Sequence, residues 1–234
     1  SVPNEDFIKL FISCFPSYKI FNSTELTIQP LKIIFLLLKQ DGFISKFTNS
    51  ILFLMKYFNC KDPIIISYSL KLTFALITDI KLSAKFSVFI STIVSLLKID
   101  SENVSLLAAA CITKMIPNIY DLSIILKDNL TNYIKQALLK DDNTCKSVLR
   151  LIGSLSLTQI GLKYIETNNY LNVISKFLKH EESSIRQLSL MIFTSYSSFN
   201  PSSPFLIQNL QVFFDLLKDK ELKKYSLMFM EKIT

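Results

Sequence analysis

The chain has 234 residues, half of them apolar, and a formal net charge of +7. This composition excludes a disordered chain, because the apolar residues can build a sizeable core. Only three glycines and seven prolines interrupt it, too few for the many tight turns of an all-β protein. Charged or helix-breaking residues interrupt every apolar run before the 20 or so residues that a bilayer requires. The sequence therefore predicts an all-α protein without a transmembrane segment.

The expected helices follow one another as copies of one unit, and each copy contains a residue that closes an apolar run. The first and weakest copy, "SYKIFNSTELTIQPLKIIFLLL", covers 17–38. The second, "YFNCKDPIIISYSLKL", has Cys60 at the closing position. The clearer copies close on Lys98, Lys140, Lys179 and Lys218, at successive steps of 38, 42, 39 and 39 residues from Cys60. A steady period near 40 residues is typical of a helical solenoid.

Each copy contains two helices with different apolar patterns. Before the closing lysine, "NYLNVISKFLK" places Leu171, Ile174, Phe177 and Leu178 on one face of a helix. The helix after it, "SIRQLSLMIFTSYSSF", is apolar around more of its circumference, so we expect it to pack between neighbouring copies. Short polar residues between the two helices are suited to accept the first backbone N–H groups of the second helix. They are Asp100, Ser101, Asp142, Asn143, Ser183 and Asp219.

Two copies carry a further short helix, expected at 121–129 and at 157–169. Each ends in asparagine, which tolerates the left-handed backbone conformation of a helix stop. "FNPSSP" at 199–204 is the best candidate for a linker, and its length also fits a turn between repeats.

One short, one medium and one long inner helix in about 40 residues resembles the armadillo repeat, and the N-terminal copies are equally similar to HEAT repeats. The resemblance implies one domain, 1–234, folded as a right-handed superhelical solenoid of about five to six repeats. The start at "SVPNEDF" and the weakly capped last copy suggest a fragment of a longer protein, and the resemblance implies kinase or scaffold regions as its companions. A missing repeat, or self-association through the C-terminal repeat, would then shield Phe229 and Ile233.

Armadillo and HEAT proteins generally act as scaffolds, so the resemblance implies a partner segment lying along a groove of inner helices. The family pattern places two positions of each inner helix in that groove, one turn apart. The first row is Leu72, Ala110, Arg150, Met191 and Met228. The second row is Leu76, Lys114, Ser154, Ser195 and Lys232. Import adaptors of this family carry Trp and Asn there, and this chain has no Trp at all.

From these rows we select Lys114, Arg150, Ser154, Met191, Ser195 and Lys232 as the groove site. The cations would face an acidic segment of the partner, the serines would donate hydrogen bonds to its backbone, and methionines at the groove would adapt to its apolar side chains. In the alternative interpretation the methionines belong to the core and the lysines are simply solvated.

Two other binding classes remain open. Six helical pairs resemble the tubulin-binding TOG domain, and a row of lysines lies near the turns: Lys61, Lys98, Lys140, Lys179, Lys218 and Lys220. A lysine that closes a helix also offsets the helix dipole, which explains this row without tubulin. The same basic edge would suit RNA or an acidic membrane surface. Nucleic acid is disfavoured because Phe35, Phe53, Phe74 and Phe193 follow the core pattern and only two arginines are present.

We find no catalytic apparatus, metal site or cofactor motif in the sequence, and expect neither an enzyme nor a small-molecule substrate. The single histidine, His180, is expected in a solvated turn beside Glu181 and Glu182. "DDNTCKS" lacks the central Gly and closing Glu of a calcium loop. The four cysteines lie 34 to 51 residues apart within or beside apolar runs, as buried thiols do in a reducing compartment. We therefore expect a cytoplasmic or nuclear location.

Overall fold

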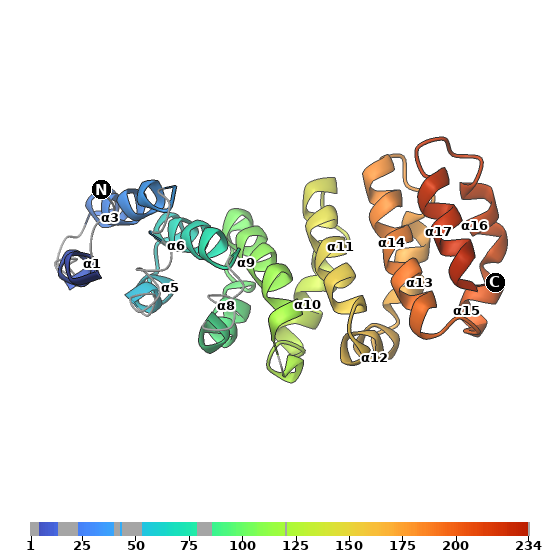
Figure 1. Cartoon of the computed structure of the whole chain (residues 1–234), viewed down its shortest axis with the longest axis horizontal. Coiled ribbons are helices and arrows are strands. Elements are labelled where there is room, and N and C mark those ends of the chain that lie inside the picture. The colour runs from blue at the N-terminus through green and yellow to red at the C-terminus, as the bar shows by residue number, and fades with distance from the viewer. Residues whose placement is uncertain are drawn as a thin grey trace. The chain divides into compact units, whose positions relative to one another are not determined.

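The computed structural model describes residues 5–13, 23–39, 43, 53–78, 86–119 and 121–233. All regular elements in these ranges are helical, and no strand occurs among them. The chain divides into two compact units, Ser1–Tyr120 (unit 1) and Asp121–Thr234 (unit 2). Each unit repeats the same arrangement, in which inner helices lie side by side and shorter outer helices cover one face of them (Figure 1). That all copies form one continuous domain remains a prediction.

Unit 1 has three inner helices, α3, α6 and α9. Neighbours in this series pack against each other, while the outer helices α5 and α8 pack on α6 and α9 respectively. The helices α1, α3, α5 and α6 span Glu5–Ser13, Thr24–Leu37, Met55–Phe58 and Pro63–Leu76. The 3-10 helix η2, then α8, α9 and the 3-10 helix η3 span Phe86–Phe89, Ile90–Leu96, Glu102–Met115 and Ile116–Asn118.

Unit 2 has the inner helices α11, α14 and α17. As expected from its wide apolar face, α14 packs between the other two. The 3-10 helix η4, then α10, α11 and α12 span Leu122–Ile124, Asp128–Ala137, Asp142–Ser156 and Gln159–Thr167. The helices α13, α14, α15, α16 and α17 span Tyr170–Phe177, Ser183–Phe199, Pro204–Gln208, Leu210–Leu216 and Lys223–Ile233.

The predicted closing residues lie where the outer helices end. Lys98, Lys179 and Lys218 each directly follow the C-cap residue of α8, α13 or α16, and Lys140 lies one position further beyond α10. Cys60 follows the C-cap of α5 in the same way. The apolar stripe of α13 is also as predicted, because Leu171, Ile174 and Leu178 are buried. Hence the period seen in the sequence is the period of the outer helices.

The caps of the inner helices agree only in part with the expected residues. Ser101 occupies the N-cap position of α9, but its side chain accepts no capping hydrogen bond, so the prediction holds for its position alone. In α11 the cap is Asp141, whose carboxylate accepts from the backbone N–H groups of Asn143 and Thr144, so Asp142 and Asn143 already belong to the helix. Asp219 accepts from the N–H of Glu221 in the turn that precedes α17. Short polar runs locate these helix starts to within a residue or two.

Of the two further helices, one forms and one does not. α12 forms within 157–169 and is followed by Asn169 in the left-handed conformation, with φ 58°, which confirms that expectation. The expected helix at 121–129 is wrong. Only the three-residue η4 forms there, capped by the Asp121 carboxylate, and Asn129 lies inside α10 rather than at a helix stop. "FNPSSP" is the turn that joins α14 to α15.

One position of each inner helix from α6 to α17 carries a small or β-branched side chain that is fully buried. These residues are Ser69, Ala108, Val148, Ser189 and Ser226. The hydroxyls of Ser69 and Ser189 bond the carbonyl four residues earlier on their own helix, so they cost no unpaired donor. These five residues are here called the spacer column.

Candidate functional site

Two rows of accessible side chains follow the inner helices of each unit. The first row lies eight residues after the first residue of α3, α6, α9, α11 and α14, and it continues on α17 two residues beyond the spacer column. Its members, exposed or partly exposed, are Lys32, Lys71, Ala110, Arg150, Met191 and Met228. The second row, one turn further, is Leu36, Ala75, Lys114, Ser154, Ser195 and Lys232, also exposed or partly exposed.

From Ala110 onward the predicted groove positions are exposed or partly exposed, whereas the two predicted on α6 are wrong. Leu72 and Leu76 are completely buried, so neither faces a groove. The accessible residues are Lys71 and Ala75, one position earlier in each case. The turn between outer and inner helix varies in length, so the residue that closes the outer helix does not fix the register of the inner one. Counting from Pro63 at the start of α6, after its cap Asp62, gives the correct register.

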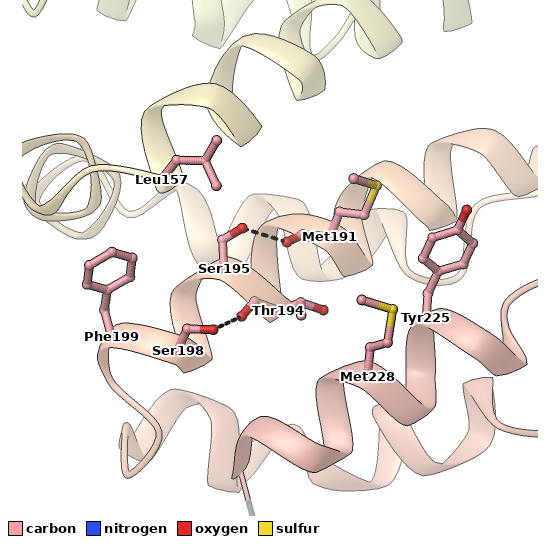
Figure 2. A pocket seen from close by; sticks show the side chains of 8 residues that line it. All are labelled: Leu157, Met191, Thr194, Ser195, Ser198, Phe199, Tyr225 and Met228. Atoms are coloured by element: carbon pink, nitrogen blue, oxygen red, sulfur yellow. Dashed lines mark hydrogen bonds between the residues drawn. The ribbon is translucent and has the colours of Figure 1, made fainter. Parts of the chain in front are cut away.

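In unit 2 the rows border a hollow of about 440 Å³ between α14 and α17. Leu157, the C-cap residue of α11, also lines it (Figure 2). Met191 from α14 and Met228 from α17 both border it, and they are 47% and 45% exposed. The methionines are therefore surface residues rather than core. The other lining residues are Leu157, Thr194, Ser195, Ser198, Phe199 and Tyr225.

The three serine and threonine hydroxyls that α14 contributes to this hollow use their protons within that helix. Ser195 donates to the carbonyl of Met191 at 3.1 Å, and Ser198 donates to the carbonyl of Thr194 at 3.0 Å (Figure 2). Thr194 in turn donates to the carbonyl of Leu190. Their lone pairs remain available, so Ser195 is suited to accept a hydrogen bond from a ligand backbone N–H. The expectation that Ser195 donates to the ligand does not fit this geometry.

The rows contain cations in both units. In unit 2, Arg150 is exposed on α11, with Ser154 one turn further on the same helix, and Lys232 is exposed on α17 one turn after Met228. In unit 1, Lys114 lies over the ring of Phe74, with its ammonium nitrogen 4.8 Å from the ring centroid. None of the residues lining the α14–α17 hollow is charged, so an apolar surface with cationic neighbours results.

Sequence reasoning missed three residues of unit 1: Lys32, Tyr68 and Lys71. It also placed Phe35 and Phe74 in the core, whereas Phe35 is 41% exposed and Phe74 is only partly buried; Phe53 and Phe193 are buried as predicted. The useful signal was the Asp-Pro pair at 62–63, since Asp is a favoured cap and Pro a favoured first helical residue.

The lysine row near the turns is exposed at all six positions, and Lys218 pairs with Asp215 within its own turn at 2.9 Å. His180 takes part in turn structure, because its Nδ1 accepts from the N–H of Glu182 and its Nε2 lies 3.7 Å from Asp142. Among the described residues no cluster of three His, Cys, Asp or Glu side chains is placed to hold a metal ion. No described helix combines the length and the hydropathy that a bilayer span needs.

The C-terminal helix shows a different apolar surface from the expected one. Phe229 is completely buried and packs on Phe213, with ring centroids 4.1 Å apart. It therefore needs no shield from another chain or repeat. The exposed apolar residues of α17 are Leu227 and Met228.

Comparison with solved structures identifies the fold. A designed armadillo repeat protein in complex with the peptide (KR)4 is 13% identical, with a TM-score of 0.80 over 98% of this chain and 99% of that one. Computationally designed armadillo repeat proteins for modular peptide recognition are represented by a structure 12% identical, with a TM-score of 0.79 over 99% and 100% of the two chains. A third designed armadillo repeat protein has a TM-score of 0.75 at 12% identity, over 99% and 100%.

No protein-family model and no curated protein sequence matches the chain. At 12–13% identity the structural likeness defines the fold and nothing finer. The protein is an all-α solenoid with an armadillo-like repeat fold.

Proposed function

We propose that this protein is a non-enzymatic scaffold that binds an extended segment of a partner protein along the exposed rows of its inner helices. The observation that carries the proposal is the α14–α17 hollow. No charged residue lines it, and Met191 and Met228 expose nearly half of their surface there. Thioethers adapt to side chains of different shape, which suits a surface that receives apolar residues. Two of the similar designed proteins bind or were designed to recognise peptides, which supports a peptide as the ligand.

Each unit offers its own contact residues on its own inner helices. In unit 2, Met191 and Met228 receive apolar side chains, and Ser154 and Ser195 pair with the ligand backbone. Arg150 and Lys232 attract acidic residues of the segment, as does Lys114 in unit 1. We place the protein in the cytoplasm or nucleus, because Cys111 and Cys145 are buried free thiols.

A peptide library displayed on phage tests the proposal when selected on the whole chain. Because the chain contains no Trp, a Met228→Trp variant carries one tryptophan, which can be excited selectively over the tyrosines and lies in the hollow. The selected peptides are expected to shift its emission to shorter wavelength as the indole leaves water. A Met191→Glu/Met228→Glu variant should lose at least about tenfold in affinity for them, equivalent to about 1.4 kcal/mol.

The matched control places two glutamates on other exposed apolar residues. Leu139 lies in the turn after α10 and Ile207 lies on α15, and both are more exposed than the methionines. Leu139→Glu/Ile207→Glu makes the same change of net charge and should leave the affinity unaltered. Equal affinities for the two double variants, each with an unchanged helical circular-dichroism signal, would show that the rows do not bind the peptides.

A further inference from the structure

A second hollow, of about 380 Å³, lies in unit 1 between α3 and α6. Its apolar part is formed by Leu31, Phe35, Leu36 and the ring of Tyr68. Phe35 and Leu36 are 41% and 61% exposed, so they form accessible apolar surface rather than core. Lys32 from α3 and Lys71 from α6 complete the lining. The site therefore combines an apolar floor with two cations, one from each helix.

Both cations are held by the same aromatic ring. The ammonium nitrogens of Lys32 and Lys71 lie 5.5 Å and 5.3 Å from the centroid of Tyr68. This range is that of cation–π contacts, in which the ring attracts the cation and limits the rotamers of the lysine. Among the residues that the structure describes, no carboxylate lies within ion-pair distance of either lysine. Two like charges near one ring repel each other, and an anion between them would relieve that repulsion.

We infer that the α3–α6 hollow binds an acidic segment of a partner protein. An Asp or Glu carboxylate lies between Lys32 and Lys71, and a bulky apolar residue close to it in the segment enters the hollow against Phe35 and Leu36. Charge complementarity selects the acidic residue, and the uncharged floor selects its apolar neighbour. This inference rests on the proposed function and deepens it, because Lys32, Lys71 and Leu36 belong to the two exposed rows and the inference states the chemistry of the occupant at this part of them.

The aromatic rings favour a peptide over a nucleic acid. Proteins that bind single strands leave aromatic faces open, so that bases can stack on them. Here two ammonium groups lie over Tyr68, and Lys114 lies over Phe74 in the same unit. A membrane surface is also disfavoured, because the apolar residues line a depression instead of projecting from a flat face. Binding to RNA or to vesicles is therefore an outcome that would contradict the inference.

The test uses the whole chain and a short labelled peptide in which serine alternates with Glu and Leu, so that both residue types share one face of an extended strand. Fluorescence anisotropy at about 150 mM salt, where long-range attraction is screened, should detect binding. Replacing Glu by Gln, or Leu by Ser, should weaken it, since each removes one half of the recognition. Loss with only one of the two changes would overturn the inference.

Protein variants then locate the site. Lys32→Gln/Lys71→Gln should weaken binding by about tenfold, while Lys56→Gln/Lys98→Gln removes two exposed lysines of the same unit and should leave it unaltered. Leu36→Glu, which keeps both lysines, should also weaken it. If the two lysine pairs weakened peptide binding equally, the peptide site here would be refuted. The same would follow if Lys32→Gln/Lys71→Gln weakened binding to poly(U) and to phosphatidylserine vesicles as much as binding to the peptide.

The variant Met191→Glu/Met228→Glu separates this inference from the proposed function. It should leave binding of the alternating peptide at Lys32 and Lys71 unchanged. If it abolished that binding while the lysine variant had no effect, the peptide would occupy unit 2, and the α3–α6 site would be wrong even though the proposed function stood.

Discussion

Arg186 Nη2 donates a hydrogen bond of 2.8 Å to Asp219 Oδ2, which joins α14 to the turn that precedes α17. The same guanidinium donates to the backbone carbonyls of His180 and Glu181, in the turn before its own helix. Lys146 makes a similar link one repeat earlier, at 2.9 Å from Glu182. In unit 2, successive inner helices are therefore tied through polar contacts as well as through their apolar faces.

Replacing Arg186 by Ala should destabilise the protein by about 1–2 kcal/mol, because it removes one ion pair and two hydrogen bonds to backbone carbonyls at once. Arg186→Lys should recover little, since an ammonium cannot reach three acceptors with the geometry of the guanidinium. Urea unfolding followed by circular dichroism measures both changes. Lys218→Ala, which breaks an exposed pair with Asp215, is the control and should change stability by less than about 0.5 kcal/mol.

The contribution of Arg186 should depend on pH. Partial burial tends to raise the pKa of Asp219, but the bonds from Arg186 and from the N–H of Glu221 outweigh it and hold the pKa below its usual value of 3.8. A carboxyl with a lowered folded pKa stabilises the fold above its unfolded pKa and loses that effect as the pH falls through the folded value. The stability gap between wild type and Arg186→Ala should therefore be full at pH 7 and shrink below about pH 4. A gap independent of pH would contradict this linkage.

Two glycines should respond to alanine in opposite directions. At Gly161 an added Cβ would lie 2.1 Å from the carbonyl oxygen of Leu155, which is backbone and cannot move aside cheaply. Gly161→Ala should destabilise by about 1–3 kcal/mol. At Gly153 the nearest atom is in Ile192, 3.8 Å away, so Gly153→Ala should stabilise α11 by about 0.5–1 kcal/mol. Thermal unfolding of the two variants gives the signs directly, and the same sign for both would show the contact at Gly161 to be misjudged.

The peptide (KR)4, which is bound by one of the similar designed proteins, should bind this chain weakly. The rows carry Lys32, Lys71, Lys114, Arg150 and Lys232, and no charged residue lines the α14–α17 hollow. We expect at least about tenfold weaker binding of (KR)4 than of the alternating Glu and Leu peptide at about 150 mM salt. Anisotropy titrations of the two peptides check this order, and a preference for (KR)4 would contradict the acidic partner.

The thiols should differ in reactivity. Burial, followed by the nearby carboxylates Asp142, Asp141 and Glu182, raises the pKa of Cys145 to about 11, and burial alone raises that of Cys111. Cys60 also has a raised pKa, chiefly through burial, but is only partly buried. In a Cys14→Ser background at pH 8, a colorimetric thiol reagent should modify Cys60 first and the other two only after denaturation. Rapid reaction of Cys111 would indicate local opening of α9.

The sequence was enough to predict the repeat, because outer helices close on one residue type at a steady spacing. It was less informative where a turn changes length. The turn from Cys60 to Pro63 differs from those after Lys98 and Lys140, and one residue of error exchanged buried Leu72 for exposed Lys71. On a helix a one-residue shift in register rotates the exposed face by about 100°. The site residues therefore depend on the length of each turn, which the repeat period does not give.

Hydrogen-bond direction at the site could not be read from the sequence either. A serine hydroxyl can donate a hydrogen bond to a ligand, but the hydroxyl of Ser195 already donates its proton to the carbonyl of Met191, one turn earlier. Pairing across repeats has the same limitation. Arg186 is one of only two arginines, and nothing in the local sequence indicates that its partner is Asp219, 33 residues away.

Substitutions of buried residues in the spacer column should change which ligands the exposed rows accept. Ser189 lies two residues before Met191, and Ser226 lies two residues before Met228; both are fully buried. A bulkier side chain at Ser189 would disturb the packing of α14, and one at Ser226 would disturb that of α17, so either change would shift a thioether relative to its neighbour. Ligands with a different stride between their anchoring side chains would then fit, although no residue on the outer surface had been exchanged.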